Sequence, residues 1–203
     1  MNELNICIIT GSNRAESGSS KVADYVAQAV GEYGADSCTV LDAGEMNLPM
    51  FGQKCCDEDG CQNQIEQKQD TEFLQNTLSQ THALVIIAPE WNGTIPPALQ
   101  NILMYLDRSM VGHKPVLLVG VSAGIGGSYP IAQLRSFGFK NNRALIIPDH
   151  VIVRNLNDDF DESDHPIGPR IKESVQELAV YAKHMNHVRD ELTFDYERYK
   201  NGM

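Results

Sequence analysis

Side chains that could bind a ligand or take part in a reaction are concentrated in the segment GSNRAESGSS, residues 11–20. The segment follows an apolar run and precedes a helix-like pattern, so it is expected at a helix N-terminus, where unpaired N–H groups and partial positive charge favour an anion. Gly11 and Gly18 allow the backbone to approach a ligand closely. The segment also supplies four hydroxyls and a planar cation, which are Ser12, Ser17, Ser19, Ser20 and Arg14. Together these groups predict a phosphate-binding loop.

Known phosphate-binding patterns do not fit this segment. GxxxxGK[ST], counted from Gly11, places Glu16 and Ser17 where Gly-Lys is required. GxGxxG fails at Asn13, which also occupies the position where a CxxxxxR phosphatase loop would carry its arginine. A solvated serine-rich turn that caps a helix therefore remains the alternative interpretation.

A second polar segment follows another apolar run. Pro89 ends that run, and Pro96 and Pro97 suit the first turn of the next helix. Trp91 is the only tryptophan, and an aromatic plane among amide and hydroxyl groups suits a flat heteroaromatic ligand. The alternative is a tryptophan that anchors the loop to the core. The polar and aromatic loop between these prolines consists of Glu90, Trp91, Asn92, Gly93 and Thr94.

Residues 120–124 match GxSxG, the pattern of a nucleophile elbow in serine hydrolases. The elbow requires a helix directly after Gly124, whereas Gly126 and Gly127 prolong the loop. In this alternative Ser122 is the nucleophile, and its partners are Asp149 or Asp164 and His150 or His165. The hydrolase interpretation leaves the other two segments unexplained.

Five β-branched, apolar runs separate these segments. They are nearly continuous rather than alternating, which is typical of strands buried on both faces. The runs cover residues 4–9, 37–42, 82–89, 114–122 and 143–148, the last with a continuation into 150–153. Helical patterns lie between them at residues 22–30 with Gly34 as the stop, 65–78, 97–106, 131–139 and 171–187.

The alternation of strands and helices predicts an α/β fold, in which helices cover both faces of a parallel sheet. Ligands of such sheets bind at the carboxyl ends of the strands, where the strand order reverses. The loops after the first, third and fourth runs are therefore expected to form one site. We expect a single domain over residues 1–203, with a polar tail from about residue 193.

Composition excludes several classes of function. Acidic residues outnumber basic ones by 27 to 16, which gives a net charge of −11, and no basic cluster is present. Nucleic acid is therefore not an expected partner. No apolar stretch approaches the roughly 20 residues of a membrane span, and residues 1–3 lack the basic start of a signal peptide. We expect a cytoplasmic protein that does not bind membranes.

The five cysteines fall into two groups. Cys7 and Cys38 lie in apolar runs and are expected to be buried thiols. Cys55, Cys56 and Cys61 cluster in a polar segment without CxxC spacing, which favours an exposed loop with incidental thiols. Metal binding or a redox-sensitive disulfide is the alternative for that cluster. His184 and His187, one turn apart, are expected to lie on a solvated helix face.

The chain resembles the NADPH-dependent FMN reductases, a flavodoxin-like family that includes chromate and quinone reductases. GSNRAESGSS resembles the family loop GSxRxxSxN. PEWNGTIPPALQNILMYLDRS is similar to PEYNxSxPxxLKNxxDW over its whole length, and SAGIGGSYPIAQLRSF resembles the third family motif, a glycine-rich loop with a following helix. The motifs occur in the family's order, with Asn13, Ser19, Trp91 and Gln100 as departures.

The resemblance implies a flavodoxin-like three-layer sandwich with a five-stranded parallel sheet in the order 2-1-3-4-5, which binds FMN. It implies phosphate contacts from the first loop, through Ser12, Arg14, Ser17, Ser19 and Ser20. It places the ribityl chain and ring beside Pro89, Glu90, Trp91, Asn92 and Thr94. Ser122, Ala123 and Gly124 would border the other side of the ring.

The activity implied by the resemblance is electron transfer from NADPH or NADH, through bound FMN, to a small acceptor. Quinones, free flavins, azo compounds and metal oxyanions are the candidate acceptors. Hydride transfer needs no general base, so no catalytic acid or base is assigned. The resemblance also suggests a homodimer or higher homo-oligomer, with Leu103, Met104 and Leu106 available for its interface. A flavodoxin-like carrier that binds FMN without turnover is a further alternative.

Overall fold

The computed structural model describes residues 3–14, 17–52, 62–156 and 166–193. Its strands are β1 (Asn5–Thr10), β2 (Ser37–Asp42), β3 (Ala83–Pro89), β4 (Pro115–Val121) and β5 (Leu145–Val153). Its helices are α1 (Gly18–Glu32), α2 (Gln62–Gln80), α3 (Pro97–Tyr105), α4 (Arg108–Val111), α5 (Ser128–Gln133), the π-helical turn η1 (Leu134–Gly138) and α6 (Gly168–Glu191). The short helix α4 is not indicated by the sequence pattern, and the predicted helix over residues 131–139 is divided between α5 and η1.

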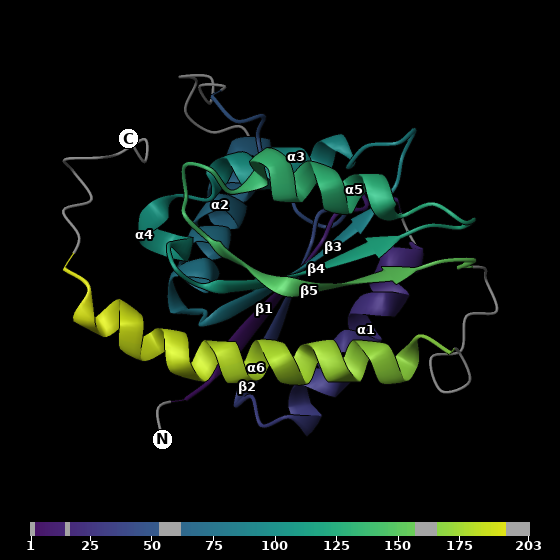
Figure 1. Ribbon diagram of the computed structural model, residues 1–203. Coiled ribbons are helices and arrows are strands. Elements are labelled where there is room, and N and C mark those ends of the chain that lie inside the picture. Colours follow the sequence, from purple (N-terminus) through teal and green to yellow (C-terminus); the bar gives the residue numbers. More distant parts are fainter. Residues whose placement is uncertain (1–2, 15–16, 53–61, 157–165, 194–203) are drawn as a thin grey trace.

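The strands form one parallel sheet in the order β2-β1-β3-β4-β5. This order confirms the predicted flavodoxin-like sandwich. Helices α1 and α6 cover one face of the sheet, and α2, α3, α4 and α5 lie on the other (Figure 1). All strands point the same way, so their carboxyl ends meet at one edge, on the right of Figure 1. This edge is called the carboxyl edge, and the opposite one, where the strands begin, is called the amino edge; the outermost strands β2 and β5 are called edge strands.

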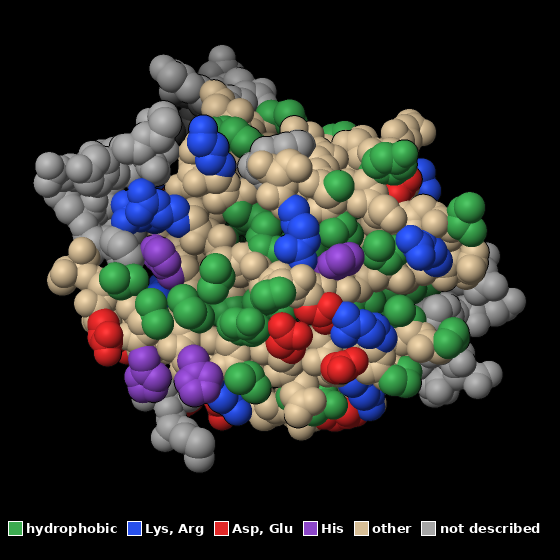
Figure 2. All heavy atoms as spheres, viewed as in Figure 1, with side chains coloured by type: hydrophobic (Ala, Val, Ile, Leu, Met, Phe, Trp, Pro, Cys, Tyr) green, Lys and Arg blue, Asp and Glu red, His purple; other side chains and the backbone are tan. Residues whose placement is uncertain are grey.

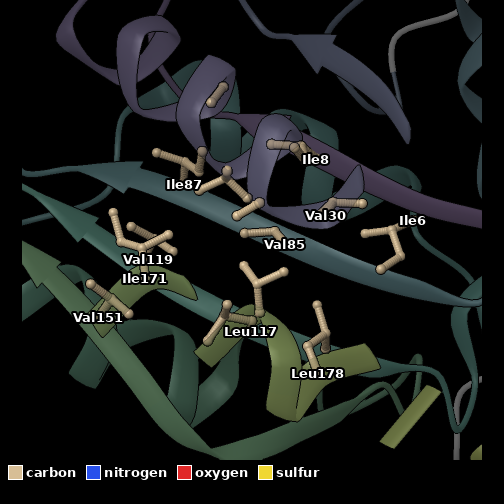
Figure 3. Close-up of a cluster of buried hydrophobic side chains, with 14 of the residues drawn as sticks. Ile6, Ile8, Val30, Val85, Ile87, Leu117, Val119, Val151, Ile171 and Leu178 are labelled. Carbon is tan, nitrogen blue, oxygen red and sulfur yellow. The ribbon is translucent and has the colours of Figure 1, made fainter. Parts of the chain in front are cut away.

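Two hydrophobic cores sandwich the central strands. Ile6 and Ile8 of β1 point into the core beneath α1 and α6 (Figure 3), whereas Cys7 and Ile9 belong to the core beneath α2 and α3. Every residue of β3 and β4 is buried. The continuous apolar runs thus have the predicted cause, which is burial of both faces of the central strands.

The edge strand β2 is less buried than the sequence predicts. Leu41 is its only fully buried residue, and Cys38 is half-buried rather than buried like Cys7. Burial raises the pKa of Cys7, and it raises the pKa of Cys38 to about 11. A continuous apolar run does not encode the position of its strand within the sheet, so the exposure of β2 could not be read from it.

The other edge strand, β5, is interrupted by a bulge. Its pairing with β4 shifts between Val116 and Leu118, and Leu118 pairs with His150. The Arg135 guanidinium donates to three successive β5 carbonyls, those of Ile147, Pro148 and Asp149. Such a bulge with a proline protects a free edge from pairing with other chains. Figure 2 shows this side of the molecule, where charged and hydrophobic side chains are interspersed over β5 and α6.

Two predicted helix ends, the stop of α1 and the start of α3, are confirmed. Gly34 adopts φ +77° directly after the C-cap Tyr33 of α1, and Pro96 and Pro97 begin α3 as predicted. Assignment of Leu103 and Leu106 to a subunit interface is wrong, because both side chains are buried in the protein's own core. Met104, by contrast, is 55% exposed.

Lys114 is fully buried at the amino edge, directly before β4. Its Nζ donates to the carbonyl oxygens of Leu78, at 2.5 Å, and Ser79, at 3.2 Å, in the last turn of α2. A cation is favourable at this negative end of a helix. Burial and then the charge of Arg189 lower the pKa of Lys114 to about 7, against an opposing effect of Cys7.

The described helices include none that is both long and apolar enough to span a bilayer.

Candidate functional site

A cavity of about 490 Å³ opens at the carboxyl edge of the sheet. It is formed by the loops after β1, β3 and β4, with a contribution from the segment after β5. Its size suits a small-molecule ligand. The lining residues are Ser12, Arg14, Ser17, Gly18, Ser19, Lys21, Pro89, Glu90, Trp91, Asn92, Val121, Ser122, Ala123 and Leu156.

The structure brings together most of the residues singled out in the sequence. Ser20, Thr94 and Gly124 are the predicted site residues that do not line the cavity. The sequence interpretation named Gly18 as a point of close approach to the ligand, and it missed three lining residues, Lys21, Val121 and Leu156. Lys21 could have been found, because it directly follows the serine-rich segment. Leu156 follows β5, whose loop carries no polar or glycine-rich pattern that marks a site.

The N-terminus of α1 forms one end of the cavity. Ser17 is the N-cap, and its Oγ accepts from the Ser20 N–H at 3.2 Å. Ser19 is buried and borders the cavity. The first turn of α1 contains no acidic residue. Arg14 and Lys21 add positive charge there, although a helix dipole disfavours cations at this end.

Two glycines at this end of the cavity allow neighbouring side chains to pack directly against the backbone. A Cβ on Gly11 would lie 2.9 Å from Cβ of Leu99, so α3 packs directly against the start of the loop. A Cβ on Gly18 would lie 2.2 Å from Leu156, which approaches from beyond β5. Side chains at either position would therefore displace elements that shape the cavity.

The loop after β3 is a tight hairpin turn. Trp91 and Thr94 exchange two backbone hydrogen bonds of 2.9 and 3.0 Å, and Asn92 and Gly93 both have positive φ, as a type I′ turn requires. Thr94 donates its hydroxyl to Gln133 and so faces away from the cavity lining. The Arg14 guanidinium lies 4.4 Å from the centre of the Trp91 ring, a cation–π contact that links this turn to the loop after β1.

The loop after β4 is fixed by charged side chains at a single peptide group. The Gly127 N–H donates to Glu90 Oε2 at 2.5 Å, and the Gly126 carbonyl accepts from Arg154 Nε at 2.9 Å. Both ends of the peptide group between the two glycines are therefore held. Arg154 also donates to the Ser128 hydroxyl at the start of α5. This arrangement fixes the loop that carries Ser122 and Ala123.

The geometry around Ser122 does not support the hydrolase alternative. The helix after the GxSxG segment begins only at Ser128. His150 pairs with Leu118, four residues before Ser122, which corresponds to about 13 Å along the strand. Asp149 instead binds Arg170 and Ser174; burial alone would raise the pKa of Asp149, but these hydrogen bonds hold it below its usual range. Asp164 and His165 lie outside the described residues.

The described residues contain no group of three or more histidine, cysteine, aspartate or glutamate side chains that could hold a metal ion. Cys55, Cys56 and Cys61 lie outside the described part of the chain, as do residues 194–203 of the predicted tail.

Comparisons with known proteins agree with the fold and the motifs. The family model "NADPH-dependent FMN reductase" matches residues 4–158. An NADPH azoreductase of Bacillus sp. (strain OY1-2) is 26% identical over 193 residues, which are 93% of this chain and 98% of that protein. An FMN-dependent NADPH-azoreductase of Staphylococcus aureus (strain USA300) is 28% identical over 129 residues, 63% of this chain and 65% of that protein.

Among solved structures, the flavoenzyme NAD(P)H:(acceptor) oxidoreductase FerB from Paracoccus denitrificans aligns with a TM-score of 0.66. The alignment covers 90% of this chain and 98% of FerB at 14% identity, which shows a shared fold. The family match carries the functional assignment: it spans most of the chain and includes all three cavity loops. The family implies FMN as the flavin and NADPH as the reductant. The chain is an enzyme of the NADPH-dependent FMN reductase family.

Proposed function

We propose that this enzyme binds FMN in the cavity at the carboxyl edge and passes electrons from NADPH, or NADH, to a small acceptor. The observation that carries the proposal is the pairing of two chemistries in one cavity. One end is a helix N-terminus with hydroxyls, two cations and no acidic residue in its first turn. The other end presents Trp91 and the rigid loops after β3 and β4.

The donor set fits the phosphate and ring of FMN. The Ser19 hydroxyl, the N–H groups at the start of α1, and Arg14 and Lys21 would hold the phosphate. Ser12 lines the same end, and its Oγ already accepts from the Arg14 N–H. Pro89, Glu90, Trp91, Asn92, Ser122 and Ala123 would surround the ribityl chain and the flat ring.

FMN, when bound, would supply the hydride chemistry. The chain's residues would bind it, orient it and limit its contact with water. Glu90 is engaged by the Gly127 N–H, so its role here is to fix the loop after β4. No side chain of the cavity is assigned as a proton donor or acceptor, because hydride transfer needs none.

Azo compounds are the first acceptors to test, because two relatives carry the name azoreductase. Quinones, free flavins and metal oxyanions are the further candidates. Steady NADPH oxidation in the presence of one of these acceptors, at enzyme concentrations far below that of NADPH, is the expected result. A single stoichiometric reduction without turnover would instead indicate an FMN-binding carrier.

The binding proposal is tested by adding FMN to apoprotein and following the emission of Trp91. As the only tryptophan, Trp91 reports on one position. We expect strong quenching in proportion to occupancy, together with a bound-flavin absorbance spectrum. The control variant Trp91→Phe should lose the signal and still bind FMN, since an aromatic ring remains. Unchanged Trp91 emission at full occupancy would remove this residue from the flavin site.

We also expect a homodimer or higher homo-oligomer. Met104 is the one residue of the predicted interface set that stays exposed, on α3. Light scattering of wild type and Met104→Glu measures the assembly. A monomer in both proteins would contradict the expectation.

A further inference from the structure

Asp42 lies at the end of β2, outside the cavity lining, but a chain of hydrogen bonds connects it to the cavity. Ser20 Oγ donates to Asp42 Oδ2 at 2.9 Å, and Ser17 Oγ lies 2.9 Å from Ser20 Oγ. The other carboxylate oxygen, Oδ1, accepts from the Gly44 N–H at 2.8 Å. Ser17 itself lines the cavity.

The directions of these hydrogen bonds follow from the number of hydrogens that each group can donate. A carboxylate only accepts, and a serine hydroxyl carries one hydrogen. The Ser20 hydrogen is given to Asp42, so Ser20 Oγ can only accept from Ser17. The Ser17 hydrogen therefore points away from the cavity. Because its one hydrogen is given to Ser20, Ser17 has no donor to offer a ligand, and its Oγ also accepts from the Ser20 N–H.

We propose that Asp42 is a positioning residue for the phosphate end of the cavity, because it turns the Ser17 hydroxyl hydrogen away from a bound phosphate. The inference rests on the proposed binding of FMN. It divides the serines of the loop by role. Ser19 donates to the phosphate, whereas Ser17 and Ser20 support the helix start and transmit the effect of Asp42. Under this proposal Ser17 and Ser20 do not donate to the phosphate, whereas the family resemblance implies that they contact it.

The substitution Asp42→Asn reverses the chain of hydrogen bonds. The amide oxygen is needed by the Gly44 N–H, so the amide nitrogen must face Ser20 and donate to it. Ser20 then gives its hydrogen to Ser17, and the Ser17 hydrogen is released toward the cavity. One hydroxyl donor to phosphate is gained, and one nearby negative charge is lost. A residue with a merely structural role would, when replaced, weaken binding or leave it unchanged.

The test compares FMN with riboflavin, which lacks the phosphate, by titration of apoprotein followed through Trp91 emission. For Asp42→Asn we expect the FMN dissociation constant to fall about tenfold, as one added hydrogen bond to a charged group implies. The riboflavin dissociation constant should stay unchanged. Equal changes for the two ligands, or weaker FMN binding, would overturn the inference.

A double-mutant cycle with Ser17→Gly separates orientation from charge. Glycine is tolerated at an N-cap and removes the hydroxyl. Ser17→Gly alone gives the reference from which the effect of Asp42→Asn is measured again without the hydroxyl. In the double variant most of the gain should disappear, because only the screened charge effect remains. Full retention of the gain would show that charge alone acts, and would contradict the positioning role.

Ser20→Ala gives an independent check that keeps the carboxylate. It removes the acceptor of the Ser17 hydrogen, so FMN should bind more tightly and riboflavin equally well. A selective loss of FMN affinity would mean that Ser20 contacts the phosphate directly, against the inference. Failure of the proposed function is distinct from all of these outcomes, since wild-type protein would then not bind FMN in this cavity at all.

Discussion

The two edges of the sheet use positive charge in opposite ways. At the carboxyl edge, Arg14 and Lys21 line an open cavity beside the N-terminus of α1. At the amino edge, Lys114 is sealed against the C-terminal carbonyls of α2. A helix dipole favours a cation at its C-terminus and disfavours one at its N-terminus. Lys114 thus binds two backbone carbonyls inside the fold, whereas Arg14 and Lys21 add positive charge to a cavity that is open to ligands.

The comparison predicts that Lys114 governs stability and not ligand binding. Lys114→Ala should lower the free energy of unfolding by about 2–3 kcal/mol, because it leaves a cavity and two less satisfied carbonyls. FMN should bind the folded variant as tightly as wild type. Chemical denaturation and FMN titration measure the two effects. Lys114→Met, which keeps most of the volume, should lose less stability, and a fully stable Lys114→Ala would break the comparison.

Arg14 should show the converse behaviour. Arg14→Ala is expected to weaken FMN binding by about 1.5–3 kcal/mol, roughly 10- to 150-fold, since a charge-assisted phosphate contact is lost. Riboflavin affinity and unfolding free energy should change little. The matched variant Arg14→Lys keeps the charge but loses the planar stack on Trp91, and should fall between the two. Equal weakening of both ligands would place Arg14 away from the phosphate.

The lowered pKa of Lys114 adds a pH dependence to the amino edge. Burial lowers this pKa to about 7, whereas an unfolded lysine titrates near 10.5. Between these values the unfolded chain binds more protons, so the free energy of unfolding should rise with pH from about 7 to about 10. The contribution is at most about 1.4 kcal/mol per pH unit. Lys114→Met should lack it; an identical pH profile in that variant would assign the effect elsewhere.

Within the carboxyl edge, Glu90 should affect ring binding without distinguishing the two ligands. Glu90→Ala releases the Gly127 N–H and is expected to cost about 1 kcal/mol in binding both FMN and riboflavin. Glu90→Gln retains an acceptor oxygen and should behave like wild type. Parallel titrations of both ligands measure this difference. A loss confined to FMN would mean that Glu90 acts on the phosphate end.

The sequence predicts the fold well because the apolar runs record burial directly. β3 and β4 read as buried on both faces, and they are. β2 reads the same way, yet it lies at an edge with Cys38 half-buried. Strand order is set by how the crossovers pack in space, and a run of apolar residues does not contain that information.

The sequence predicts which loops form the cavity, but it does not predict which of their side chains line it. Glycine, proline and hydroxyl patterns mark the loops that meet, but not where each side chain points. Ser20 turns toward Asp42, and Thr94 turns toward Gln133. Such directions depend on partners that are distant in the sequence. Leu156 and Arg154 come from the segment after β5, where nothing in the sequence marks either residue as part of the site.

Burial of the Lys114 amine also allows chemical modification of this residue to report how often the amino edge opens. Acylating reagents modify exposed lysines at once, but they reach the Lys114 amine only when the amino edge opens. If that opening is rare and reclosing is fast, the rate of Lys114 modification reports the population of the open form. Peptide mass spectrometry of a timed labelling series would then read the stability of this edge in dilute buffer, without denaturant.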